Sequence, residues 1–145
     1  MKAKIWTIPA DRMKAGTEHR VPLTDRAMDI LRLMEKSKSC DLIFPGQTRG
    51  QPLSDMSLSA VLKRAKLGHY TVHGFRSTFR DWAGETTDYP RELVEAALAH
   101  TIGSKVERAY RRGDALERRR VLMAAWAGFL DRPPISAKAK PKPTA

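Results

Sequence analysis

Residues 73–82 read His73-Gly74-Phe75-Arg76-Ser77-Thr78-Phe79-Arg80-Asp81-Trp82 and carry the main signal for the fold. On a helix, where successive residues lie about 100° apart, this stretch separates into two faces. Its aromatic residues share one face: Phe75, Phe79 and Trp82. Its basic residues share a second face, about 130° away by the same rotation: His73, Arg76 and Arg80. We therefore predict a helix that is anchored by aromatic side chains and presents cations.

The basic face suits a phosphate group. A guanidinium binds two oxygens in a fork, and an imidazole one turn away supplies a further directed donor. The same spacing also fits an ordinary solvated basic face, so the pattern alone leaves both interpretations open.

The residues before this helix predict a β-hairpin followed by a helix. Polarity alternates over residues 4–9, and a second short apolar stretch covers residues 20–23, with polar turn residues between them. Prolines in both stretches indicate edge strands. Thr24 is predicted to cap a helix that ends near Lys38.

Further apolar repeats predict helices along the rest of the chain. Their starts are expected at Ser54 or Asp55, at Thr71, at Pro90 and at Asp114. We expect the helix from Thr71 to reach about Gly84 and the helix from Pro90 to run toward His100, with a short helix near Tyr110. Glu117, three residues after Asp114, would complete an acidic capping box for the last helix. The predicted class is therefore mainly α with a small N-terminal β-hairpin (α+β).

Composition favours a polyanionic partner. The 145 residues, enough for one domain, include 27 Lys and Arg against 16 Asp and Glu, a formal net charge of +11. Nucleic acid is the first candidate, although an acidic protein partner or mere solubility fits the charge equally well. We predict one domain over residues 1–131 and a disordered basic Pro/Lys tail over residues 132–145.

Other features restrict the compartment. The single cysteine, Cys40, cannot form an internal disulfide, and no Cys/His cluster has zinc-site spacing. No apolar run approaches the roughly 18 residues that cross a bilayer. We therefore predict a cytoplasmic chain with no membrane contact and no metal, in which Cys40, Trp82 and Trp126 serve packing and His19 and His69 lie at the surface.

Three motifs in a fixed order carry a family resemblance. His73-x-x-Arg76 is followed by Leu98-Ala99-His100 and, ten residues later, by Tyr110. This order resembles the signature of the tyrosine recombinases, the phage integrase family. Flanking words, among them Trp6-Thr7-Ile8-Pro9 and Arg118-Arg119-Arg120, resemble prophage integrases of the satellite-phage type. The resemblance covers about residues 4–131.

The resemblance implies roles for five residues. Tyr110 would attack the scissile phosphate and become joined to the 3′ end of the cut strand. Arg76 and His100 would hold the nonbridging oxygens, His73 would assist proton transfer, and Lys14 would protonate the departing 5′ oxygen. The family needs no nucleotide cofactor and no metal. Taken singly, Tyr110 also fits an ordinary helix tyrosine with a buried ring.

The resemblance also implies partners. Double-stranded DNA at an attachment site would be bound, with the DNA-binding residues predicted to be Arg80, Arg111 and Arg112. Self-association through the C-terminal helix, residues 114–130, is expected, in the nucleoid-associated cytoplasm of a bacterium.

Members of the family use a second arginine upstream of the hairpin, and this chain starts after that position. We therefore expect a C-terminal catalytic fragment, a piece of a longer integrase or a degraded prophage reading frame, with weakened activity. A catalytically inactive DNA-binding remnant is the alternative, and a type IB topoisomerase is a third possibility.

Overall fold

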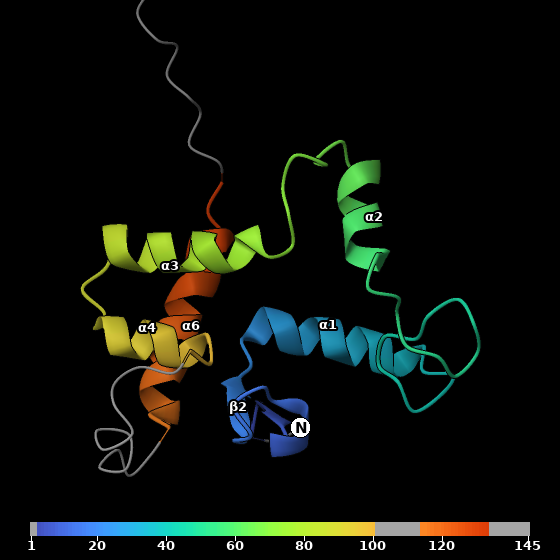
Figure 1. Cartoon of the computed structure of the whole chain (residues 1–145), viewed down its shortest axis with the longest axis horizontal. Helices are drawn as coiled ribbons and strands as arrows, with labels where there is room; N and C mark the ends of the chain where they lie inside the picture. Colours follow the sequence, from blue (N-terminus) through green and yellow to red (C-terminus); the bar gives the residue numbers. More distant parts are fainter. Residues whose placement is uncertain (1–2, 101–113, 134–145) are drawn as a thin grey trace, which may run out of the picture.

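Figure 1 shows the computed structural model of the chain, which describes residues 3–100 and 114–133. Within these residues five α-helices follow a two-stranded antiparallel hairpin. The elements are β1 (Ile5–Ile8), a 3₁₀ turn (Ala10–Arg12), β2 (His19–Pro22), α1 (Asp25–Lys36), α2 (Ser57–Arg64), α3 (Gly74–Thr86), α4 (Arg91–Ala97) and α6 (Leu116–Leu130). The predicted class, mainly α with a small β part, is confirmed. None of the described helices is long and apolar enough to span a membrane.

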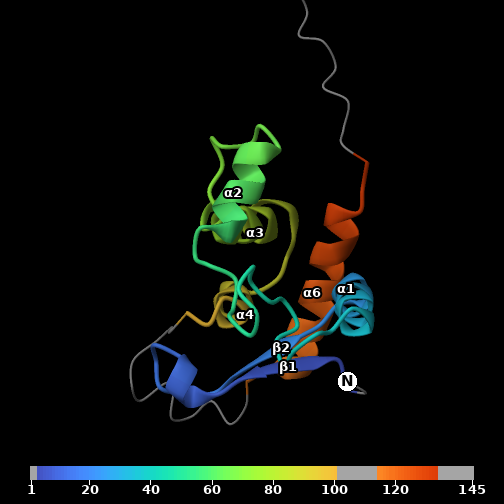
Figure 2. The same ribbon diagram turned by 90° about the vertical axis from the view of Figure 1, so that its right-hand side faces the viewer.

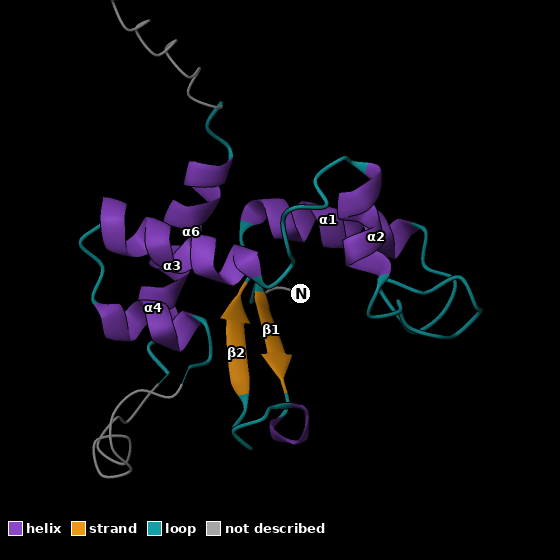
Figure 3. Ribbon diagram, turned by 45° about the horizontal axis from the view of Figure 1, so that its top comes forward, coloured by secondary structure: helices purple, strands orange, loops and turns teal. Residues whose placement is uncertain are grey.

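The hairpin forms where the alternating stretches predicted it, as Figure 3 shows. Its register pairs Ile5 with Pro22 and Ile8 with His19. Pro22 stands at the end of its strand, where a missing N–H breaks no ladder bond. The hairpin is the whole sheet among the described residues, so both strands are edges, as the prolines indicated.

Threonine side chains mark two of the helix starts. Thr24 accepts a hydrogen bond from the N–H of Ala27 at 3.3 Å, which confirms the predicted cap of α1. Thr71 accepts from the N–H of Gly74 at 3.0 Å, so it satisfies the first N–H of α3 although that helix begins three residues later. The predicted start of α2 was too early, because Asp55 and Met56 form a turn after Ser54 and the helix begins at Ser57.

The core lies between α3, α4 and α6, which Figures 1 and 2 show side by side. Its buried members are Phe79, Trp82, Ala83, Leu93, Val94 and Leu122. Trp126 of α6 packs on Trp82 with ring centroids 5.0 Å apart, so the packing role predicted for both tryptophans is confirmed. Phe75 was wrongly placed in this core. Its side chain is 53% exposed, because the described core draws on α3 only from Phe79 onward.

A buried arginine joins the hairpin to α6. The Arg119 side chain is 1% exposed and donates to the backbone oxygens of Asp114 and Arg20, each at 2.7 Å. Its third bond reaches the Asp114 carboxylate at 2.9 Å. Arg20 of β2 binds that carboxylate through two nitrogens, both at 2.8 Å. One carboxylate therefore bridges two arginines from different elements, and the cluster fixes where the hairpin sits.

The predicted capping box is not formed, since the N-cap of α6 is Ala115 and Asp114 lies one residue earlier. The Asp114 carboxylate accepts from the N–H of Leu116 at 3.2 Å. The reciprocal bond from Glu117 is not made, because the Glu117 carboxylate pairs with Arg120 at 3.1 Å instead. The two arginines hold the pKa of Asp114 below its usual value, chiefly through the hydrogen bond from Arg20.

Replacing Asp114 should destabilise the fold. In Asp114→Asn the buried Arg119 loses its countercharge, and we expect the free energy of unfolding to fall by about 2–4 kcal/mol in urea titrations. This is less than a fully buried pair would cost, because the Asp114 side chain is 34% exposed. Glu117→Gln is the matched control, since its exposed pair should change stability by no more than about 0.5 kcal/mol. Equal effects from both variants would contradict a structural role for the cluster.

Candidate nucleic-acid interface

Arg76 and His100, predicted to act together, are in contact. Arg76 lies in the first turn of α3, and its Nη2 is 2.7 Å from Nε2 of His100 and donates to the Leu98 carbonyl at 2.6 Å. A guanidinium keeps all its protons, so it is the donor to the imidazole. Nε2 of His100 therefore accepts, and the ring proton of the neutral histidine belongs on Nδ1.

The end of α4 brings His100 to this position. The helix stops at Ala97, short of the run toward His100 that the apolar pattern predicted. Ala99 adopts a left-handed backbone with φ 56°, and the N–H of His100 bonds back to the Glu95 carbonyl at 2.9 Å. This hydrogen-bonding pattern is a Schellman turn. The turn reverses the chain and places the imidazole over the last turn of its own helix.

Glu95, on the buried side of α4, is a site residue that the sequence analysis missed. Its side chain is 8% exposed, and its carboxylate accepts from Nδ1 of His100 and pairs with Nε of Arg80 at 2.9 Å. Arg91 approaches to 3.9 Å. The hydrogen bond from His100, aided by Arg80, lowers the pKa of Glu95 despite burial. A single acid inside the apolar run 93–98 was the signal available in the sequence.

The other predicted site residues are less closely placed. His73 is exposed just before α3, and Lys14 is exposed in the turn between β1 and β2. The His73 carbonyl accepts the backbone N–H of Arg76 at 3.0 Å, but within the described part of the chain no side-chain hydrogen bond or ion pair joins His73 or Lys14 to Arg76 or His100. Arg80 reaches the site through Glu95. The remaining predicted residues lie outside the described residues: Tyr110, Arg111 and Arg112.

His19 was wrongly predicted to be a surface residue, whereas His69 is exposed as expected. His19, in β2, is half-buried and lies near the backbone of Ala97 at the end of α4. Burial lowers its pKa, and the nearby guanidinium groups of Arg119 and Arg76 lower it further. His19 thus lies where the hairpin approaches the turn that carries His100.

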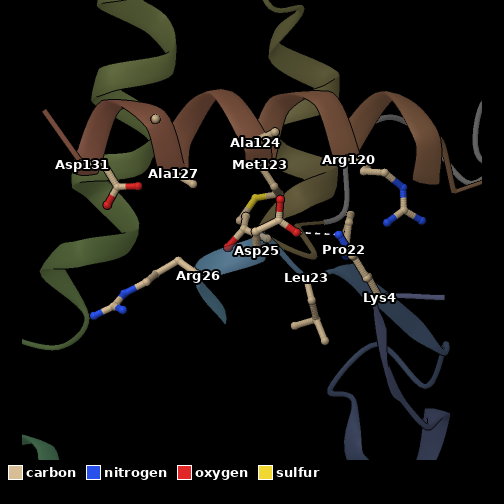
Figure 4. Close-up of a pocket in the computed structure, with 12 residues that line it drawn as sticks. Lys4, Pro22, Leu23, Asp25, Arg26, Arg120, Met123, Ala124, Ala127 and Asp131 are labelled. Carbon is tan, nitrogen blue, oxygen red and sulfur yellow. Dashed lines mark hydrogen bonds and ion pairs between the residues drawn. The ribbon is translucent and has the colours of Figure 1, made fainter. Parts of the chain in front are cut away.

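A cavity of about 380 Å³ lies away from this site, between α6 and the start of α1. Figure 4 shows the residues that line it, among them the Lys4–Asp25 ion pair and Met123, Ala124 and Ala127 of α6. None of the predicted site residues that the structure describes lines it. The cavity is therefore not part of the Arg76–His100 site.

Comparison with known proteins shows which family the chain belongs to. Residues 1–117 match the model of the phage integrase family. The chain belongs to this family. It is 44% identical to the prophage integrase IntA of Escherichia coli K12 over 131 residues, covering 88% of this chain and 32% of that relative. No solved structure matches it.

Two phage proteins show the same partial coverage. The integrase of Enterobacteria phage P4 is 31% identical over 147 residues, covering 88% of this chain and 33% of that protein. The integrase of Shigella phage Sf6 is 30% identical over 132 residues, covering 88% and 34% respectively. This member of the phage integrase family thus spans about a third of the length of these relatives.

The half-buried histidine should make stability depend on pH. His19 has a lower pKa in the folded chain than the ordinary value of 6.5, so the unfolded chain binds its proton first as pH falls. Its contribution is complete above pH 6.5 and is lost as pH drops through the lowered folded pKa. In urea titrations between about pH 7 and pH 5, His19→Gln should show a flatter pH dependence than the wild type. His69→Gln, at an exposed site, should keep the wild-type slope, and a loss of slope there would refute this assignment.

Proposed function

We propose that this chain is the catalytic segment of a site-specific recombinase that cuts and rejoins duplex DNA through Tyr110. The observation that carries the proposal is the contact between Arg76 and His100, 24 residues apart, in a chain of the phage integrase family. The phenolic oxygen of Tyr110 attacks the scissile phosphate, forms a 3′-phosphotyrosyl bond and releases the 5′ oxygen. Attack by that 5′ hydroxyl, or by one from another strand, restores the phosphodiester and frees the tyrosine.

The electrostatics of the pair support this chemistry. The Arg76 guanidinium is exposed, and the His100 side chain is 45% exposed, so both groups are open to a phosphate from solvent. An ordinary tyrosine has a pKa of about 10 and is a weak nucleophile near neutral pH unless cations favour its phenolate. Fixed cations also stabilise the charge that builds on the phosphate oxygens during attack.

The remaining roles follow the family pattern. Lys14 protonates the departing 5′ oxygen and His73 assists proton transfer. Arg80, Arg111 and Arg112 contact the DNA backbone, and Arg80 has guanidinium nitrogens beyond the one that pairs with Glu95. The net charge of +11 supports binding to a polyanion.

In this proposal residues 1–131 form one partial catalytic domain and residues 132–145 form a basic tail. The chain acts on DNA at the bacterial nucleoid, in the cytoplasm, and self-associates through α6. A second function is that of a DNA-binding remnant without activity, which the net charge of +11 fits equally well. The two functions differ in whether a covalent bond to DNA forms.

Removing the phenolic oxygen should abolish that bond. A duplex nicked beside the cleavage site traps the covalent intermediate, because the short cut strand diffuses away before religation. Tyr110→Phe should give no adduct on denaturing gels while binding the same duplex with unchanged affinity. Tyr70→Phe alters another tyrosine, with its side chain 55% exposed, and should leave the adduct intact.

The duplexes to test are those spanning the ends of the genetic element that carries the gene. Binding without any adduct from the wild-type chain would favour the remnant. An adduct that persists in Tyr110→Phe would refute the proposed nucleophile.

A further inference from the structure

The Glu95 carboxylate divides its two oxygens between different partners. Oε1 pairs with Arg80 of α3 at 2.9 Å and lies 3.9 Å from Arg91, whereas Oε2 accepts from Nδ1 of His100. A carboxylate that is 8% exposed is costly to bury unless it is paired. The arginines supply the countercharge, and the histidine bond sets the direction in which the second oxygen points.

We propose that Glu95 is the positioning residue for His100, holding the ring with its proton on Nδ1 so that Nε2 faces the phosphate. This inference rests on the proposed function, because it names how one of the phosphate-binding groups is oriented. Glu95 itself touches neither DNA nor the reacting atoms. It acts through the imidazole, in the way that a carboxylate orients a catalytic histidine elsewhere.

The arrangement explains how Nε2 serves two partners. In the DNA-free chain Nε2 accepts a hydrogen bond from Arg76 at 2.7 Å. To donate to a phosphate oxygen the ring must carry a second proton, on Nε2, taken from solvent. The Glu95 carboxylate keeps its bond to Nδ1–H in both states, so the orientation of the ring does not change.

Arg80 has an indirect part in this arrangement. Its Nε bond to Oε1 leaves Oε2 as the oxygen available to His100. The turn at Ala99 fixes the other end, because the His100 N–H is bonded to the backbone carbonyl of the same glutamate. Backbone and side chain of Glu95 thus hold one histidine at two points.

The first test reads the histidine directly and needs no DNA. Nitrogen-15 NMR of the imidazole rings, assigned with His100→Gln, reports which ring nitrogen carries the proton. At a pH where the ring is neutral, the wild-type chain should show His100 protonated on Nδ1, with a proton that exchanges slowly. In Glu95→Gln the tautomer protonated on Nδ1 should no longer predominate over the one protonated on Nε2, because a neutral amide replaces the charged acceptor. Glu92→Gln, an exposed acid in the first turn of the same helix, should leave the spectrum unchanged.

The second test uses the nicked duplex. Adduct formation by Glu95→Gln should be slower by about 10- to 100-fold, as expected when a group that orients a catalytic side chain is lost. DNA affinity should change little, and Glu92→Gln should react at the wild-type rate.

The two tests separate the inference from the proposed function. If the wild-type chain forms no adduct, the recombinase proposal fails while the NMR result still decides the role of Glu95. A wild-type His100 protonated on Nε2 overturns the inference, whether or not Glu95→Gln folds. An unchanged ring proton in a folded Glu95→Gln variant also overturns it.

Discussion

The carboxylate of Asp114 is the constraint on which the arrangement of the described chain depends. Two arginines converge on it, Arg20 from the hairpin and the buried Arg119 from α6. The Arg119 guanidinium is 1% exposed and therefore needs a countercharge. Any packing that separated the hairpin from α6 would leave this charge buried and unpaired. An apolar cluster of the same volume could be equally stable, but it would tolerate sliding of the hairpin on the helix. The two parallel bonds from Arg20 to the Asp114 carboxylate do not allow such sliding.

Glu95 repeats this arrangement on α4. Each of the two acids joins two elements of the fold, and each is paired with arginine on a partly buried surface. His19 lies between the two clusters, with the guanidinium of Arg119 on one side and the end of α4 on the other. The hairpin thus lies near the turn that carries His100, and the ion pairs of Glu95 contribute to the geometry of the proposed phosphate site together with the apolar core.

Local signals in the sequence predicted the elements well. The Thr24 cap and the alternating strands depend on interactions within a few residues, which a sequence records directly. Errors came where distant contacts decide. Phe75 fits the helical period of the core and yet is exposed, and the helix toward His100 ends early at a left-handed alanine. Propensity gave no reason to expect that conformation at alanine.

From the sequence alone one can identify the family, the mainly helical class and the candidates Arg76 and His100. This is possible because the order of motifs and the apolar period are properties of the linear sequence. The tertiary structure was needed to show that these two side chains are in contact, that Glu95 hydrogen-bonds to the histidine and that His19 is half-buried. These findings required the structure because the burial and the partners of a charged group or an imidazole depend on its surroundings. Those surroundings are assembled from residues up to 99 positions apart, as in the bond from Arg119 to the Arg20 carbonyl.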